Sequence, residues 1–220
     1  MKHTPVTDLP PEWQETIEEF LTMRFRYQSA MREVRTKLEI LDDEFSMRHS
    51  RNPIHHMESR IKTPNSILQK LRRKGLAPTP QSAMDNLHDI AGIRVVCAYL
   101  NDTYAIAELL GKQDDLRILR VRDYIKCPKP NGYRSLHLIV EVPVFLSSGK
   151  ELLPVEVQIR TIAMDFWASL EHQLRYKEVT NVPETLNQQL CDAAERIAAL
   201  DSEMQHIHDQ MLSWVDQAEE

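Results

Sequence analysis

The sequence has 220 residues, of which 42% are hydrophobic and 27% are charged, and these proportions are typical of a globular protein with one substantial core. No apolar run of about 18 residues is present, and residues 1–11 lack the basic-then-apolar order of a secretory signal, so we expect neither a membrane span nor export. The three cysteines are widely spaced without a CxxC pair, which argues against a disulfide framework and a zinc site. We therefore expect a soluble protein of the reducing cytoplasm.

The net charge of -6 conceals a strong segregation of charge along the chain. Residues 48–74 contain eight Lys or Arg and one acid, and residues 117–134 contain six and one, whereas residues 184–220 contain nine acids and one base. Two basic segments in an acidic protein favour local anion sites over a general polyanion-binding surface. The alternative interpretation is a pair of solvated basic faces without a ligand.

Residues 13–41 are predicted to form a long amphipathic helix, because apolar side chains recur at alternating steps of four and three, interrupted only by Arg24. Residues 186–214 repeat this pattern. The two apolar seams consist of Trp13, Ile17, Phe20, Tyr27, Met31, Val34, Leu38 and Leu41, and of Leu186, Leu190, Ala193, Ile197, Leu200, Met204, Ile207, Met211 and Trp214. The seams could pack on each other as a hairpin or against a neighbouring subunit, and both arrangements remain open.

A shorter helix over residues 64–74 is predicted next. Its limits are indicated by an N-cap residue, a proline at the first helical position and a glycine past the end, namely Thr63, Pro64 and Gly75. Ser66 and Lys70 lie on one face of this helix because they are four residues apart. Arg60 and Lys62 stand just ahead of the positive end of the helix dipole, so these groups converge as a triphosphate requires. The alternative is a basic surface helix that only keeps the protein soluble.

The middle of the chain alternates in the manner of strands. Strands are predicted at residues 93–99, 118–124, 136–144 and 153–159, with helices near residues 103–110 and 163–176. This order of elements predicts an α+β core with a mixed sheet.

Two carboxylates are candidates for a magnesium site, because polyphosphate chemistry usually needs Mg²⁺, which prefers one or two carboxylates together with phosphate oxygens. Asp89 lies just before a predicted strand. Glu156 lies within a strand, with Gln158 and Arg160 on the same face by the two-residue period. The alternative for this strand is an ordinary amphipathic edge.

Residues 124–137 are predicted to form a shaped loop, since they contain two prolines and an Asn-Gly pair. Lys126 and Lys129 give the loop charge, and Tyr133 offers an aromatic face at its exit. Such a loop can hold a nucleotide, with the lysines on phosphates and the ring stacked on a base. The alternative is a plain hairpin turn with exposed lysines.

Four of these segments together resemble a known enzyme family. They are RxKxxxSxxxK at residues 60–70, HDIAGIRVV at 88–96, YIKxPKxNGYRSLH at 124–137 and EVQIRT at 156–161. In this order they resemble the (p)ppGpp synthetase domain of the RelA/SpoT family, and the chain looks like a stand-alone small alarmone synthetase of the RelQ type. The resemblance covers residues 45–178. It implies an N-terminal helical extension at 1–45, a catalytic domain at 46–180 and a C-terminal helix at 181–220.

The resemblance also implies a fold and a reaction. The fold is a nucleotidyltransferase-like mixed sheet of about five strands flanked by helices, with long N- and C-terminal helices. The reaction transfers the β,γ-pyrophosphate of ATP to the ribose 3′-hydroxyl of GDP or GTP in stringent-response signalling. No alarmone hydrolysis is expected, because no companion histidine pair at suitable spacing lies upstream of the His88-Asp89 pair.

Roles for individual residues follow from the resemblance alone. The ATP site would consist of Arg60 and Arg94 around the adenine and Lys62, Ser66 and Lys70 on the phosphates. Magnesium would be held by Asp89 and Glu156, with Glu156 also placed to accept or orient the 3′-hydroxyl proton. The GDP or GTP site would consist of Tyr133, stacked on guanine, and of Lys126, Lys129, Asn131, His137 and Gln158.

Relatives of this type imply a homotetramer built through the terminal helices, with (p)ppGpp as an allosteric activator and no membrane partner. Two other functions are weighed against the synthetase. An RNA- or nucleotide-binding regulatory module would use the same lysines and Tyr133 without chemistry, although two acids among phosphate-binding groups help only when a cation is present. Another nucleotidyltransferase of similar fold would release pyrophosphate instead of AMP.

Overall fold

The structure is a computed structural model that describes residues 11–48, 51–176 and 183–218. Within these ranges the elements are α1 (Pro11–Arg48), β1 (Ile54–Ile61), α2 (Pro64–Arg73), α3 (Pro80–Asn86), β2 (Ala91–Cys97), α4 (Leu100–Gly111), β3 (Arg117–Asp123), β4 (Leu136–Leu146), β5 (Gly149–Thr161), α5 (Ile162–Tyr176) and α6 (Glu184–Ala218). None of the described helices is both long and apolar enough to cross a membrane.

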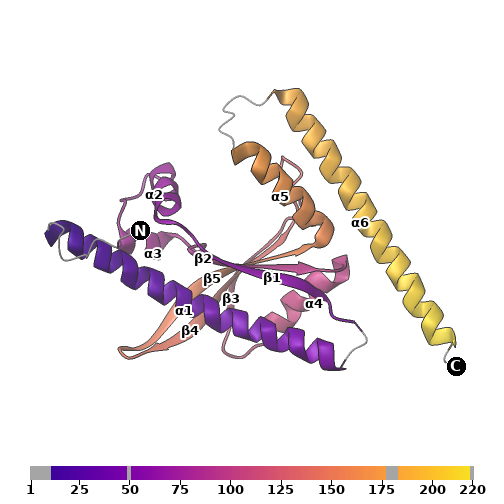
Figure 1. The fold of residues 1–220 in the computed structure, drawn as a ribbon, viewed down its shortest axis with the longest axis horizontal. Coiled ribbons are helices and arrows are strands. Elements are labelled where there is room, and N and C mark those ends of the chain that lie inside the picture. The colour runs from indigo at the N-terminus through magenta and orange to yellow at the C-terminus, as the bar shows by residue number, and fades with distance from the viewer. Residues whose placement is uncertain (1–10, 49–50, 177–182, 219–220) are drawn as a thin grey trace, which may run out of the picture.

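The strands form a single mixed sheet in the order β1-β2-β5-β4-β3. Strands β2 and β5 run parallel, whereas the other neighbours run antiparallel. The predicted α+β fold with a mixed sheet of about five strands and long terminal helices is therefore confirmed (Figure 1). Strand β1 and helix α3 were not predicted. The edge strand β1 has the sequence IHHMESRI. Most of its side chains are polar, so it lacks the regular alternation of apolar and polar residues that predicts a strand.

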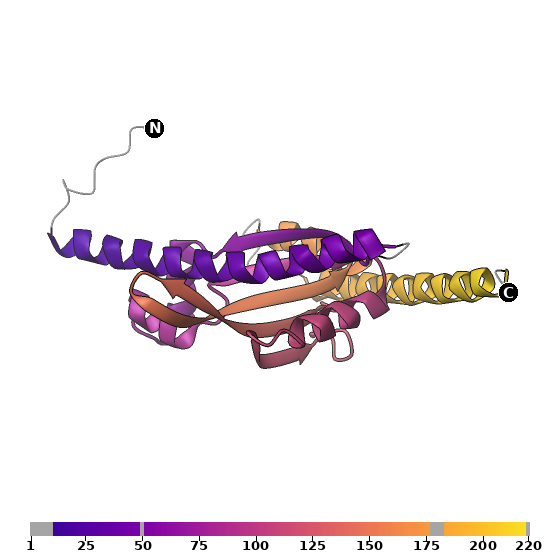
Figure 2. The ribbon, with the colours of Figure 1, turned by 90° about the horizontal axis from the view of Figure 1, so that it is seen from below.

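The core lies between the sheet and two helices. Val34 and Leu38 of α1 and Ile106 of α4 share one buried cluster with Leu138 of β4 and Val157 of β5. Helix α1 runs along the length of the sheet (Figure 2). Since side chains alternate along a strand, the neighbours of these apolar residues point to the opposite face of the sheet. That face carries the polar side chains described below.

The two long helices do not form the hairpin that was one of the two predicted arrangements. Helix α1 packs on β1, β2, β4 and β5, whereas α6 packs on α5 and α4 (Figure 1). Along the predicted seam of α1, Tyr27, Val34 and Leu38 are buried, and the side chain of Trp13 lies outside the described residues. The sheet, rather than the other helix, covers this seam because a flat apolar sheet face needs a partner of its own.

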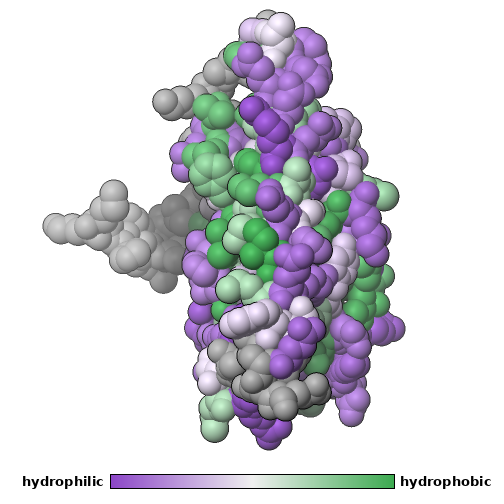
Figure 3. All heavy atoms as spheres, turned by 90° about the vertical axis from the view of Figure 1, so that its right-hand side faces the viewer, coloured by the Kyte–Doolittle hydropathy of each residue, from purple (hydrophilic) through white to green (hydrophobic). Residues whose placement is uncertain are grey.

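The outer seam of α6 is left exposed by its own chain. Leu200, Met204, Ile207, Met211 and Trp214 are between 41% and 71% exposed. Figure 3, which faces the side where α6 lies, shows apolar side chains gathered between hydrophilic ones. Large apolar side chains in one row are typical of a surface that another subunit covers. The second predicted arrangement, contact with a neighbouring subunit, therefore stays a prediction.

Candidate functional site

Two adjoining cavities of about 400 and 390 Å³ lie on the face of the sheet opposite α1, and both are lined by Asp89 and Glu156. Glu156 points to this face because its neighbours Val155 and Val157 point into the core. The first, which we call the basic cavity, is also lined by Lys70, Arg73, Lys74, Arg120, Arg122 and His137. The second, which we call the arginine cavity, is also lined by Glu58, Ser59, Arg60, Gly92, Arg94 and Gln158. The two acids thus mark the boundary between the cavities.

Helix α2 has the limits that its sequence predicts. Thr63 Oγ1 accepts a hydrogen bond from the backbone N–H of Ser66 at 3.3 Å, Pro64 opens the helix, and Gly75 follows its end with φ of 68°. The capped first turn leaves Ser66 exposed, with its hydroxyl 2.9 Å from that of Thr63. Ser66 lines neither cavity, whereas Lys70 lines the basic one.

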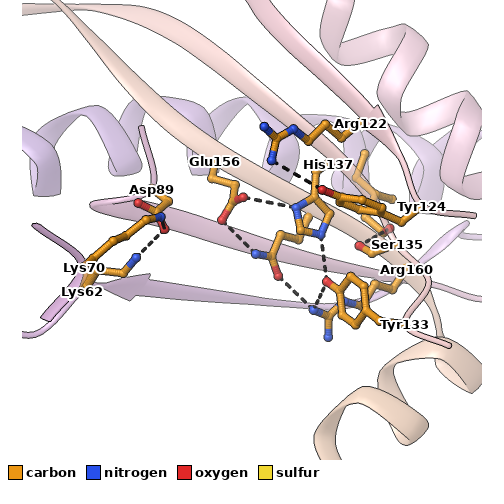
Figure 4. A network of polar contacts seen from close by, with 12 residues as sticks. Lys62, Lys70, Asp89, Arg122, Tyr124, Tyr133, Ser135, His137, Glu156 and Arg160 are labelled. Atoms are coloured by element: carbon orange, nitrogen blue, oxygen red, sulfur yellow. Dashed lines mark hydrogen bonds and ion pairs between the residues drawn. The ribbon is translucent and has the colours of Figure 1, made fainter. Parts of the chain in front are cut away.

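Three charged side chains from separate segments meet at the boundary of the cavities. Lys62 follows β1, Lys70 lies on α2, and Asp89 lies just before β2. Both lysines donate to the same oxygen, Asp89 Oδ2, and Lys70 does so at 2.5 Å (Figure 4). The other carboxylate oxygen, Oδ1, is buried and has no hydrogen-bond partner within the described ranges. Asp89 thus has two cationic partners on one oxygen and no hydrogen-bond partner on the other within the described ranges.

The electrostatics of this triad favour the charged carboxylate. Burial alone raises the pKa of Asp89, but the hydrogen bonds from Lys62 and Lys70 outweigh burial and lower the pKa below its ordinary value of 3.8. Burial lowers the pKa of Lys62, and its bond to Asp89 opposes this shift. Two ammonium groups on one carboxylate leave an excess of positive charge. Lys70 lines the basic cavity, so this excess is available to an anion that enters there.

Glu156 is also held in its charged form. Its two oxygens contact different partners: Oε1 lies 3.2 Å from His137 Nδ1, and Oε2 accepts from Gln158 Nε2 at 2.8 Å. Burial raises the pKa of Glu156, and the bonds from His137 and Gln158 outweigh this effect and lower it. The pairing of β4 with β5 sets His137 opposite Gln158. The hydrogen bond between Gln158 and Glu156 confirms that these two side chains share one face of the strand, as predicted.

The loop of residues 124–135, which we call the basic loop, brings an aromatic ring to this network. The Tyr133 hydroxyl lies 2.8 Å from His137 Nε2. Lys129 Nζ lies 4.4 Å from the centre of the Tyr133 ring. Asn131 braces the loop, since its amide donates to Glu171 at 3.1 Å and its carbonyl oxygen accepts from the backbone N–H of Tyr133 at 3.3 Å.

The structure brings most, but not all, of the predicted residues together. Around the two cavities it gathers Arg60, Lys62, Lys70, Asp89, Arg94, Tyr133, His137, Glu156 and Gln158. Lys126 instead lies over the ring of Tyr104 in α4 at 5.1 Å, and it lines neither cavity. Lys129 and Asn131 also line neither cavity: Lys129 lies over the Tyr133 ring, and Asn131 contacts Glu171 and the backbone of Tyr133. Their approach to a nucleotide therefore stays a prediction.

Several functional candidates were missed by the sequence reasoning. Arg120 and Arg122 of β3 line the basic cavity, although the sequence counted them only as charge. Their spacing of two residues predicts that both side chains lie on one face of a strand, and this spacing could have marked them as a pair of anion-binding candidates. The two-residue period places Arg160 on the same strand face as Glu156, but the sequence indicates no function for it. In the structure it is buried and donates to Tyr133 Oη at 2.6 Å.

The basic loop is seated on α6 through a glycine. Gly132 has φ of +84°, and a Cβ at this position would lie 2.6 Å from the Cβ of Ala194. We expect Gly132→Ala to lower the free energy of unfolding by about 1–3 kcal/mol, because a left-handed backbone and a steric clash add up. Gly75→Ala is the matched control, since Gly75 has φ of +68° with nothing within 4 Å of the added Cβ. Chemical denaturation of both variants measures the difference. Equal losses would show that the contact with Ala194 is not tight.

The residues present fit a hard divalent cation that phosphate oxygens complete. The described residues contain no cluster of three or more His, Cys, Asp or Glu that would hold a transition metal. Magnesium needs less, because it binds through one or two carboxylates plus substrate oxygens and water. Asp89 and Glu156 line both cavities, and Asp89 Oδ1 has no hydrogen-bond partner within the described ranges. These two acids are the groups that could hold the ion.

Comparisons with known proteins point to one family. Residues 59–181 match the model described as a region found in RelA/SpoT proteins. The chain is 45% identical over 201 residues to the GTP pyrophosphokinase YwaC of Bacillus subtilis (strain 168), covering 91% of this chain and 94% of that protein. The crystal structure of small alarmone synthetase 2 from Bacillus subtilis superposes with a TM-score of 0.79 at 44% identity, over 87% of this chain and 99% of that one. The crystal structure of small alarmone synthetase 1 from Bacillus subtilis, bound to its product pppGpp, gives 0.78 at 37% identity, over 84% and 93%. The chain belongs to the RelA/SpoT family.

Proposed function

We propose that this protein is a magnesium-dependent GTP pyrophosphokinase. It transfers the β,γ-pyrophosphate of ATP to the ribose 3′-hydroxyl of GDP or GTP, which yields ppGpp or pppGpp and AMP in stringent-response signalling. The observation that carries the proposal is the pair of adjoining cavities that share Asp89 and Glu156. A transfer between two nucleotides needs two binding sites that meet at the reacting groups, and two cavities that share both acids support such an arrangement. The relatives named as pyrophosphokinases support the same reaction.

The donor nucleotide fits the arginine cavity and α2. Arg60 and Arg94 line this cavity and offer flat guanidinium groups to an adenine ring. Lys62 and Lys70 exchange the carboxylate of Asp89 for the ATP phosphates, and Ser66 adds a hydroxyl at the N-terminal turn of α2. Before ATP binds, the Asp89 carboxylate therefore balances part of the charge of the two lysines.

The acceptor nucleotide fits the side of the site that the basic loop borders. Tyr133 offers its ring to guanine, and Lys129 adds positive charge beside that ring. Lys126, Asn131, His137 and Gln158 complete the proposed acceptor set. Glu156 accepts the proton of the 3′-hydroxyl as the oxygen bonds to the β-phosphorus. The bond between the β-phosphorus and its bridging oxygen breaks, and AMP leaves with that oxygen. Magnesium, held by Asp89 and Glu156, supplies neutralisation of phosphate charge.

Product identity tests the proposal directly. Purified protein with ATP, GDP and magnesium is expected to yield AMP and a guanosine carrying a 3′-diphosphate, resolved by anion-exchange chromatography. Release of pyrophosphate instead of AMP would identify a nucleotidyltransferase. Binding of RNA without any nucleotide product, with a steep salt dependence and no need for magnesium, would identify a binding module.

The organisation of the active protein is part of the same proposal. The terminal helices join subunits into a cytoplasmic homotetramer, supported by the exposed seam of α6. Residues 1–45, 46–180 and 181–220 serve as N-terminal extension, catalytic domain and C-terminal helix. Light scattering of the purified protein is expected to give four times the monomer mass, and a stable monomer would reject the tetramer.

A further inference from the structure

Five side chains of the site form a closed ring of hydrogen bonds (Figure 4). Arg160 Nη2 donates to Tyr133 Oη at 2.6 Å, and Tyr133 Oη lies 2.8 Å from His137 Nε2. His137 Nδ1 lies 3.2 Å from Glu156 Oε1, and Gln158 Nε2 donates to Glu156 Oε2 at 2.8 Å. Gln158 Oε1 accepts from Arg160 Nη2 at 3.0 Å, which closes the ring. Two arms therefore lead from Arg160 to Glu156.

The chemistry of the two ends sets the direction of the bonds that Arg160 and Glu156 make. A guanidinium only donates and a carboxylate only accepts, so Arg160 donates to Tyr133 Oη and His137 Nδ1 donates to Glu156. The contact between Tyr133 Oη and His137 Nε2 joins these two bonds into one arm. The other arm agrees, because Gln158 accepts through oxygen and donates through nitrogen.

Arg160 itself is anchored away from the basic loop. The residue is only 5% exposed, and its Nη1 donates to Asp165 Oδ1 of α5 at 3.1 Å. Its guanidinium also lies 5.1 Å from the centre of the Tyr133 ring. A group held by β5 and α5 can therefore fix a ring that belongs to a loop.

We propose that Arg160 is a positioning residue that fixes Tyr133 and Glu156 relative to each other through the Tyr133 hydroxyl. The inference rests on the proposed function and assigns different functions to the ring and the hydroxyl of Tyr133. The ring of Tyr133 binds the acceptor base, whereas its hydroxyl carries the link from Arg160 to His137. The link sets the orientation of the Glu156 carboxylate toward the 3′-hydroxyl. Loss of the hydroxyl alone therefore slows turnover without weakening acceptor binding.

Steady-state kinetics of Tyr133→Phe and Arg160→Lys test this inference. Tyr133→Phe keeps the stacking ring, so we expect KM for GDP within about twofold of the wild type and kcat lower by about 10- to 100-fold, as for a small misplacement of a reacting group. Arg160→Lys keeps the charge but lacks the planar guanidinium whose Nη1 holds Asp165 while its Nη2 serves both arms. We expect a similar fall in kcat. The double variant should be no slower than the slower single variant, because both changes open the same ring.

The matched control is Tyr99→Phe. The Tyr99 ring stacks on His208 of α6 with 4.0 Å between the ring centroids, and Tyr99 lines neither cavity. We expect kcat and KM of this variant to equal those of the wild type. A wild-type kcat for Tyr133→Phe, a rise in KM alone, or losses that multiply in the double variant would overturn the inference while the synthetase activity stands. Absence of AMP from the wild type would instead reject the proposed function. Thermal unfolding of each variant identifies any loss caused by misfolding, and Tyr133→Phe decides the outcome if Arg160→Lys does not fold.

Discussion

Replacing Glu156 with glutamine is expected to lower kcat by about 10²- to 10⁴-fold while both nucleotides still bind. The carboxylate accepts at both oxygens, from His137 at Oε1 and from Gln158 at Oε2. A glutamine of the same size offers one acceptor and one donor, so its amide nitrogen would face another donor. In the proposed function it also cannot take the proton of the 3′-hydroxyl. The variant would therefore remove the proposed base and disturb its hydrogen bonds, although a side chain of the same size fills the same space.

The measurement is a comparison of turnover with equilibrium binding of ATP and GDP to the same variant. Glu151→Gln is the matched control, because Glu151 lies on the same strand, β5, and pairs with Arg26 of α1 at 3.3 Å away from both cavities. It should retain wild-type kcat. Full activity of Glu156→Gln would show that another group receives the proton.

The local parts of this site could be predicted because short-range rules determine them. Capping residues fix α2 within one residue, so the face that carries Lys70 follows from helical spacing. The two-residue period places Glu156, Gln158 and Arg160 on one strand face, and their hydrogen bonds confirm it. In both cases the relevant neighbours are close in the sequence, and no knowledge of the sheet order is needed.

Contacts between distant segments could not be predicted in the same way. The pairing of Lys62 and Lys70 with Asp89 depends on the register of β1 against β2, and β1 itself was not recognised among its polar residues. Lys126 points to Tyr104 because α4 lies beside the basic loop, which no local pattern reveals. The hydrogen-bonded ring through Arg160 likewise depends on five side chains from two strands and a loop, and their positions follow only from the three-dimensional fold.

The Asp89 triad connects donor binding with cation binding in the proposed function. The two lysines share one carboxylate, which offsets part of their positive charge. The ATP phosphates would replace this carboxylate as partner of the lysines, and Asp89 would then be available to hold the cation. Asp89 would therefore have one function before ATP binds and another afterwards, so a substitution at this residue can separate donor binding from catalysis.

Replacing Asp89 with asparagine is therefore expected to have opposite effects on binding and on turnover. Without its carboxylate, Lys62 and Lys70 lose their shared partner, so ATP in the absence of magnesium should bind about tenfold tighter. The cation loses one of its two protein ligands, so kcat should fall by about 10²-fold or more, and the magnesium concentration for half-maximal activity should rise. Asp115→Asn is the control, since it breaks a Lys–Asp pair with Lys37 at 2.7 Å that lies outside both cavities. Titrations of ATP with and without magnesium, together with turnover, separate the effects, and weaker binding of metal-free ATP by the Asp89 variant would contradict the exchange of partners.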